Sequence, residues 1–160
     1  MRILHPAVEP LRLLFMKTFF AAFLSTAAAM LALDSVWLTL TASPLYRAQI
    51  GGLMLTTFDP VPAGAFYLIY VLAVVILVVQ PALAGGRLLG ATTRGALFGL
   101  AAYATYDLTN LATLRGWSIT VTIADLCWGT FLTAVAATVG CWVTTLIAAR
   151  LAQRFPVATE

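Results

Sequence analysis

Residues 63–84 form an apolar run that contains no charged side chain. As an α-helix this run would be about 33 Å long, which is enough to cross the hydrocarbon core of a bilayer. Only 9% of the 160 residues are charged and 62% are hydrophobic. A soluble domain of this size needs more charged groups to cover its surface, so the composition predicts that lipid is the solvent of the chain.

Three further apolar runs predict an all-α, polytopic membrane protein built as a bundle of four transmembrane helices. The expected spans cover about 18–41, 63–84, 95–112 and 120–148. They make up a membrane domain at 17–149, flanked by an N-terminal tail or extension at 1–16 and a C-terminal tail at 150–160.

The beginning of the chain leaves two questions open. Met16 is followed by Lys17 and an apolar run, which is typical of a natural start. Residues 1–15 are then either an extension or a short amphipathic segment on the membrane surface. A cleaved signal peptide is an alternative for the first run, because Ala27-Ala28-Ala29 resembles a cleavage site. The run continues through Trp37, and this length favours a permanent span.

The longest connection lies between the first two spans. Ser43-Pro44 is a suitable helix start, so a short interfacial helix is expected over Leu45–Ile50. Asp59-Pro60 then predicts a break before the second span.

The basic residues are unevenly distributed over the connections. Seven of the nine Lys and Arg residues lie at 1–17, at 150–160 and in the loop at 85–94, and the other two are Arg47 and Arg115. The positive-inside rule therefore predicts that both termini are cytoplasmic. The basic residues form no stripe, so nucleic acid is not an expected partner.

No metal or organic cofactor is expected. His5 is the only histidine, and Cys127 and Cys141 would lie about 21 Å apart along one helix. This leaves no pair at the spacing of a zinc or haem site. Glycine-rich phosphate-binding turns are also missing from the sequence.

Three of the six acidic residues, Asp34, Asp107 and Asp125, lie inside the apolar runs. An ionised group there costs about 3 kcal/mol on insertion scales, so such groups normally face a protein interior or a watery cavity. At 1.5 Å per residue all three fall at a similar depth in the outer leaflet, below Arg47 and Arg115. Since three acids exceed two arginines, at least one carboxyl is expected to be unpaired, or neutral and protonated.

Aromatic and amide side chains accompany these acids. Tyr103, Asp107 and Asn110 are spaced i, i+4, i+7 and share one helix face. Asp34 and Asp125 are each followed by a tryptophan three residues later. The candidate polar site consists of Asp34, Trp37, Arg47, Tyr103, Tyr106, Asp107, Asn110, Arg115, Asp125 and Trp128.

Structural interpretations compete with a functional one. Gly95 and Gly99 continue the face of Tyr103 at four-residue steps, and such small-residue faces let membrane helices pack closely. Tyr46 and Trp117 suit ordinary membrane-interface positions. Alternatively, the acids form ion pairs with Arg47 and Arg115, and these pairs only stabilise the helix bundle.

The run Tyr103–Leu114, YATYDLTNLATL, is long and polar for a membrane span. It resembles the signature of the domain-of-unknown-function 2177 family of bacterial membrane proteins. The resemblance covers about Met16 to Ala149 and includes the segments at 33–38, 66–70, 80–83 and 125–130. It implies a compact four-helix, multi-pass protein of the bacterial inner membrane, and it implies no activity.

Three functions follow as hypotheses. The first is a lipid- or isoprenoid-binding site or a small membrane enzyme, with Asp107 and Asp125 as acid and base and three polar side chains orienting the ligand. Those three are Tyr103, Tyr106 and Asn110. The second is an assembly or structural subunit with a membrane-protein partner or further copies of itself. The third is a component of a proton-coupled transporter. The expected partners are thus the lipid bilayer, a lipid-like ligand and a membrane protein.

Overall fold

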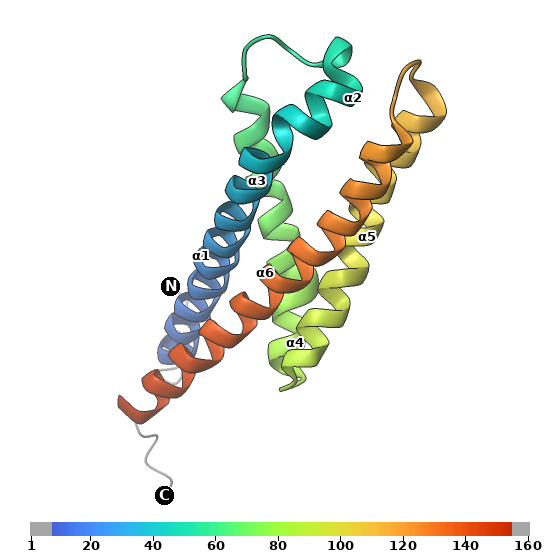
Figure 1. Ribbon diagram of the computed structural model, residues 1–160. Coiled ribbons are helices and arrows are strands. Elements are labelled where there is room, and N and C mark those ends of the chain that lie inside the picture. Colours follow the sequence, from blue (N-terminus) through green and yellow to red (C-terminus); the bar gives the residue numbers. More distant parts are fainter. Residues whose placement is uncertain (1–7, 155–160) are drawn as a thin grey trace, which may run out of the picture.

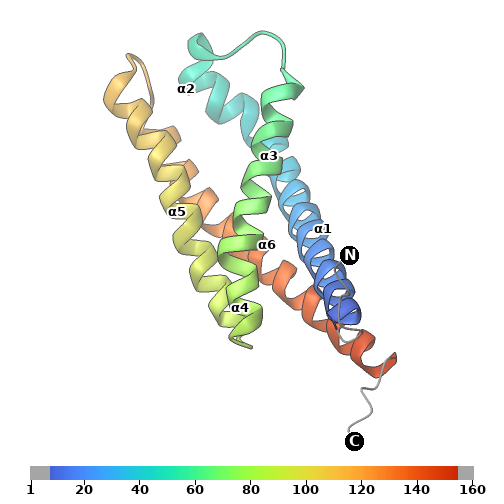
Figure 2. The ribbon, with the colours of Figure 1, turned by 180° about the vertical axis from the view of Figure 1, so that it is seen from behind.

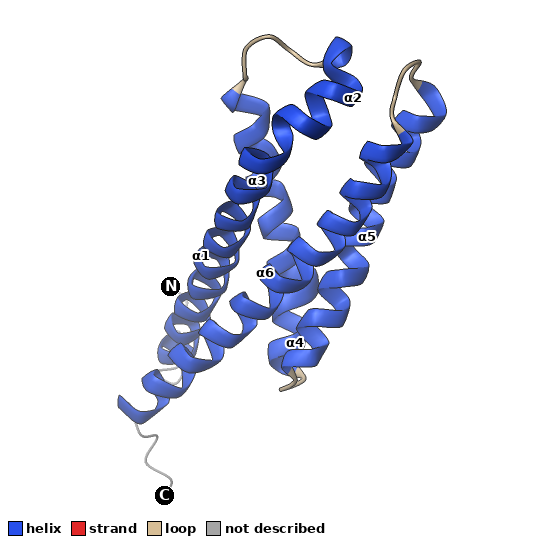
Figure 3. Ribbon diagram, viewed as in Figure 1, coloured by secondary structure: helices blue, strands red, loops and turns tan. Residues whose placement is uncertain are grey.

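The computed structural model describes residues 8–154, and every regular element in that range is a helix (Figure 3). The elements are α1 (Val8–Thr41), α2 (Ala48–Ile50), α3 (Pro60–Val74), α4 (Gln80–Ala84), α5 (Leu88–Thr113) and α6 (Ile119–Arg154). A π-helical segment, Ala42–Arg47, joins α1 to α2, and a second one, Val75–Val79, joins α3 to α4. The predicted all-helical class is thereby confirmed for the described residues. Parts of both predicted tails, 1–7 and 155–160, lie outside them.

Three helical stretches are long and apolar enough to cross a membrane: Arg12–Leu53, Pro60–Ala84 and Ile119–Leu151. They correspond to the first, second and fourth expected spans. The helix of the third expected span, α5, has 26 residues but is less apolar. It carries Arg94, Asp107 and several threonines. The number of four spans therefore stays a prediction.

The chain passes Ser43-Pro44 without starting a new helix. α1 continues through the π-helical turn into α2, and the stretch up to Leu53 is one helix. Residues 45–50 are helical as predicted, but they continue α1 and do not form a helix of their own. Proline lacks the N–H group of a regular helical hydrogen bond and clashes with the preceding turn, and the wider π-turn accommodates it.

The predicted break at Asp59-Pro60 is the beginning of α3. The carboxylate of Asp59 accepts a hydrogen bond from the backbone N–H of Val61 at 3.0 Å, and Pro60 occupies the first helical position. This is favourable capping, because proline has no N–H to leave unpaired in the first turn. α3 therefore starts three residues before the expected start at 63.

The helices lie side by side with alternating directions (Figures 1 and 2). α5 and α6 make the largest helix–helix contact, and α1 packs against α6. One end of the molecule carries α2 and the α5–α6 turn, and we call it the α2 end. The first turns of α1, the α4–α5 turn and the last turns of α6 lie at the opposite end (Figure 1). Toward the α2 end, α1 and α6 diverge in both views.

Small residues allow α5 and α6 to approach closely. A Cβ atom added at Gly99 would lie 2.2 Å from the carbonyl oxygen of Gly129, and one added at Gly95 would lie 2.8 Å from that of Thr133. Both distances are shorter than any van der Waals contact. The predicted packing face of small residues is confirmed, and it fixes the register of the antiparallel pair.

Candidate functional site

Asp34 of α1 is buried and accepts two hydrogen bonds from other helices. The Tyr67 hydroxyl of α3 donates to Oδ2 at 2.9 Å, and the Trp128 indole of α6 donates to Oδ1 at 2.9 Å. One carboxylate thus links three helices, and each of its oxygens has a donor. Such pairing offsets the cost of burying the group.

Asp125 of α6 anchors the continuation of α1. The Tyr46 hydroxyl donates a short hydrogen bond to Oδ1 of Asp125, and the Trp37 indole donates to the Tyr46 oxygen at 2.9 Å. Trp37 also stacks on Trp128, with ring centroids 4.5 Å apart and planes 7° from parallel. The stacked tryptophans therefore connect the hydrogen bonds around Asp34 with those around Asp125.

Asp107 of α5 differs from the other two acids. Its side chain is fully buried, and neither carboxylate oxygen has a hydrogen-bond partner among the described residues. The position of Asp107 along the bundle follows from a contact between Tyr103 and Gly129. A Cβ atom added at Gly129 would lie 2.1 Å from the Tyr103 ring. Asp107 and Asp125 are each one helical turn from this contact, toward the α2 end, because the two helices run in opposite directions.

The structure does not bring the two arginines to the acids. Arg47 and Arg115 are exposed, and the hydrogen-bond donors to Asp34 and Asp125 are tyrosines and a tryptophan. Bundle fixation by arginine–carboxylate pairs therefore receives no support from these contacts. In the part of the chain that the structure describes, no cluster of three or more His, Cys, Asp or Glu could hold a metal ion.

Two other residues of the sequence-based site lie at its margin. Tyr106 is 59% exposed, and its ring meets Trp117 edge-to-face at 5.6 Å. Asn110 is half-buried. The structure therefore gathers the acids, Tyr103 and the two tryptophans, and leaves Tyr106 and Asn110 beside them.

Sequence reasoning missed two donors, Tyr46 and Tyr67. The sequence predicts a membrane-interface position for Tyr46, but its hydroxyl donates to Asp125 on a distant helix. Tyr67 lies in an apolar run, and a tyrosine hydroxyl buried there needs a partner. That need was the available signal, but the identity of the partner depends on tertiary packing.

A cavity of about 450 Å³ opens between α3 and α5 and reaches α6. It is lined by Phe66, Tyr70, Ala102, Tyr103, Tyr106 and Asp125, and we call it the aromatic cavity. The Tyr70 hydroxyl is hydrogen-bonded to the Thr133 hydroxyl at 2.8 Å, which fixes its ring in the wall. The cavity therefore combines apolar ring faces with one carboxylate.

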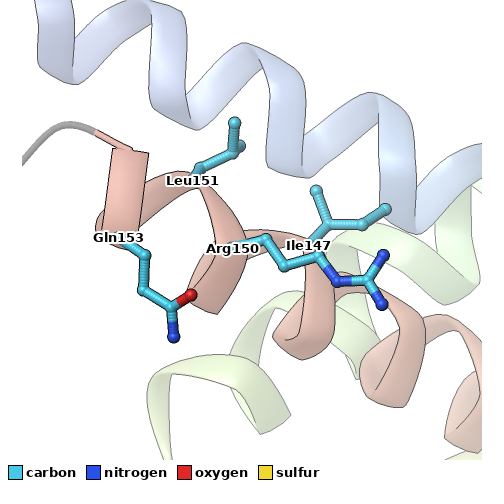
Figure 4. A pocket seen from close by; sticks show the side chains of 4 residues that line it. All are labelled: Ile147, Arg150, Leu151 and Gln153. Atoms are coloured by element: carbon cyan, nitrogen blue, oxygen red, sulfur yellow. The ribbon is translucent and has the colours of Figure 1, made fainter.

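A different pocket, of about 340 Å³, lies in the last turns of α6 at the opposite end (Figure 4). It is lined by Ile147, Arg150, Leu151 and Gln153. Leu151 and Gln153 point to opposite sides of the helix, so this pocket is a surface feature of one element. The aromatic cavity, walled by three helices, is the better candidate site.

Comparison with known proteins identifies a family. A family model described as "Predicted membrane protein (DUF2177)" matches residues 19–142, which is most of the chain. No curated protein and no solved structure matches the sequence or the fold.

Proposed function

Because the chain belongs to the DUF2177 family of predicted membrane proteins, we propose that it is a multi-pass protein that binds a lipid-like ligand in the aromatic cavity. The cavity itself carries this proposal. Its volume of about 450 Å³ lies within the range of about 300–1,000 Å³ that is common for small-molecule sites. Its rings suit an apolar chain, and Asp125 supplies a polar group at one side.

The position of the cavity favours a ligand that enters from the bilayer. Phe66 and Tyr70 belong to the candidate membrane span Pro60–Ala84, and Asp125 to Ile119–Leu151. We therefore expect the cavity to open toward lipid. A single-chain amphiphile or a lipid tail can reach it by lateral diffusion.

Binding is better supported than acid–base catalysis. An acid–base pair needs both carboxyl groups within reach of the reacting atoms. Asp125 lines the cavity, but Asp107 is fully buried and does not. The assembly-subunit and transporter hypotheses stay predictions, and a stoichiometric protein partner or a proton flux in vesicles would support them.

The proposal includes a topology. Four spans with α5 as the third, a membrane domain of about 17–149 and cytoplasmic termini would suit a bacterial inner membrane. In support, α5 lies along α6, which is itself a candidate span (Figure 2). Arg87, Arg94 and Arg150 are exposed and belong to segments at the end opposite α2, as the positive-inside rule expects.

Filling the cavity tests the proposal. Ala102 lines it, whereas the adjacent Ala101 is exposed on the same helix and does not. We expect Ala102→Phe to expel a co-purified ligand, because the new ring occupies the ligand's space. Ala101→Phe adds the same ring outside the cavity and should retain the ligand.

Native mass spectrometry of protein released from lipid nanodiscs provides the measurement. The expected result is one discrete adduct on the wild type and on Ala101→Phe, reduced at least about tenfold on Ala102→Phe. Equal adduct occupancy on all three proteins would show that the ligand binds elsewhere, and the proposed function would then be rejected.

A further inference from the structure

The aromatic cavity is lined by an acidic side chain and by no basic side chain. Of the six residues that line it, four present aromatic rings and one presents a carboxylate, and none is basic. The ring faces carry partial negative charge, as does the acid. The carboxylate and the ring faces therefore favour a positively charged or hydrogen-donating group, and the tyrosine hydroxyls can accept a hydrogen bond from it.

Asp125 keeps acceptor capacity for such a group. Among the described residues only Tyr46 donates a side-chain hydrogen bond to it, and that bond goes to Oδ1. Oδ2 therefore has no side-chain donor in the part of the chain that the structure describes. A carboxylate has room for several donors, so a ligand ammonium can bind without displacing Tyr46.

Asp107 lies at the same level and brings no positive charge to Asp125. It lies one helical turn beyond Tyr103, as Asp125 lies one turn beyond Gly129, and both of its oxygens lack a partner. Arg47 and Arg115 are exposed, and among the described residues Tyr46 donates to Asp125 and no group donates to Asp107. Charge interactions are strong where water is excluded, so an anionic headgroup would be repelled here.

We propose that the aromatic cavity takes an amphiphile with an ammonium headgroup, held between the carboxylate of Asp125 and the rings of Tyr70, Tyr103 and Tyr106. Aromatic faces with a nearby carboxylate recognise ammonium groups through cation–π and ionic attraction. The apolar remainder of the cavity, with Phe66 and Ala102, takes the adjoining part of the chain. This inference rests on the proposed function, since it concerns the same cavity.

Twelve-carbon amphiphiles with different headgroups test it, because their chains are identical. The probes are dodecyltrimethylammonium, dodecylphosphocholine, dodecyl maltoside and dodecyl phosphate, added to nanodisc-embedded protein and counted as bound adducts. We expect dodecyltrimethylammonium to bind at least about tenfold more tightly than dodecyl phosphate, with dodecyl maltoside between them. Dodecylphosphocholine reports whether a phospholipid-type ammonium also fits. Tetramethylammonium, which has no chain, should bind far more weakly.

Two variants separate the headgroup from the chain. Asp125→Asn keeps an oxygen that can accept from Tyr46 but loses the charge, so it should abolish the preference for the cation while still binding dodecyl maltoside. Tyr106→Leu removes an exposed ring from the cavity wall and should weaken binding of the cation alone. If Asp125→Asn does not fold, the wild-type ranking and Tyr106→Leu still decide.

The outcomes are distinguishable. Equal binding of all headgroups, or a preference for the phosphate, would overturn the ammonium assignment and leave the cavity a lipid site. If tetramethylammonium bound as tightly as the twelve-carbon cation, the inference that the ligand carries an apolar chain would be rejected. Failure of every probe, with no effect of Ala102→Phe, would remove the proposed function itself.

Discussion

Gly99→Ala should lower the free energy of unfolding by about 3 kcal/mol, the upper end of typical overpacking effects. The added methyl group would lie 2.2 Å from the carbonyl oxygen of Gly129 and 2.6 Å from the hydroxyl oxygen of Thr133. The nearest of these atoms belongs to the backbone, so no change of rotamer relieves the clash. α5 and α6 must separate, and the largest helix–helix contact of the protein is then disturbed.

Gly90→Ala is the matched control. Gly90 lies in the same helix, and a Cβ atom there would meet nothing within 4 Å. This substitution should be neutral or should stabilise the helix by up to about 1 kcal/mol. Unfolding in mixed micelles with increasing denaturing detergent measures both variants. If Gly99→Ala is as stable as Gly90→Ala, the close approach of the two helices is wrong.

Tyr67→Phe should lower the free energy of unfolding by about 2 kcal/mol, the size expected for a hydrogen bond to a charged group. The substitution leaves one oxygen of the buried Asp34 carboxylate without a donor. It removes only a hydroxyl group, so the packing of the ring is kept. The connection between α1 and α3 loses its side-chain hydrogen bond.

Tyr103→Phe also removes only a hydroxyl group, but that hydroxyl has no hydrogen-bond partner among the described residues. Its effect should stay within about 0.5 kcal/mol. In an Asp34→Asn background the effect of Tyr67→Phe should shrink, because the charged acceptor is gone. Equal losses for Tyr67→Phe and Tyr103→Phe would contradict the role of Asp34 as a link between helices.

The sequence was sufficient for the helices, because their signals are local. Apolar runs of about 20 residues indicate membrane helices, and four-residue steps of glycine indicate the close α5–α6 face. The helix boundaries at proline residues were harder to predict. Ser43-Pro44 predicts a helix start, whereas the helix continues there through a π-turn. Asp59-Pro60 predicts a break, which is present, but the same pair also caps α3. A wider turn and a cap depend on geometry that the residue types alone do not fix.

The candidate site was predictable in part. The three acids and two tryptophans were expected from their cost and spacing in apolar runs, and all three acids are buried. Their partners were not predictable, since arginine and tyrosine are both plausible donors to a carboxylate. Arg47 lies next to Tyr46 in the sequence, and only the bend of the first helix decides which of them reaches Asp125. The aromatic cavity could not be foreseen, because three helices must be packed to form it.

Photo-crosslinking maps the ligand position most directly. A lipid analogue with a photoreactive diazirine near the end of its chain would be added to nanodisc-embedded protein, and the labelled peptides identified by mass spectrometry. We expect labelling concentrated on the cavity-lining residues Phe66, Tyr70, Tyr103 and Tyr106, lost in Ala102→Phe and kept in Ala101→Phe. Labelling spread over exposed apolar residues outside the cavity, such as Leu97 and Phe131, and unchanged by Ala102→Phe, would contradict it.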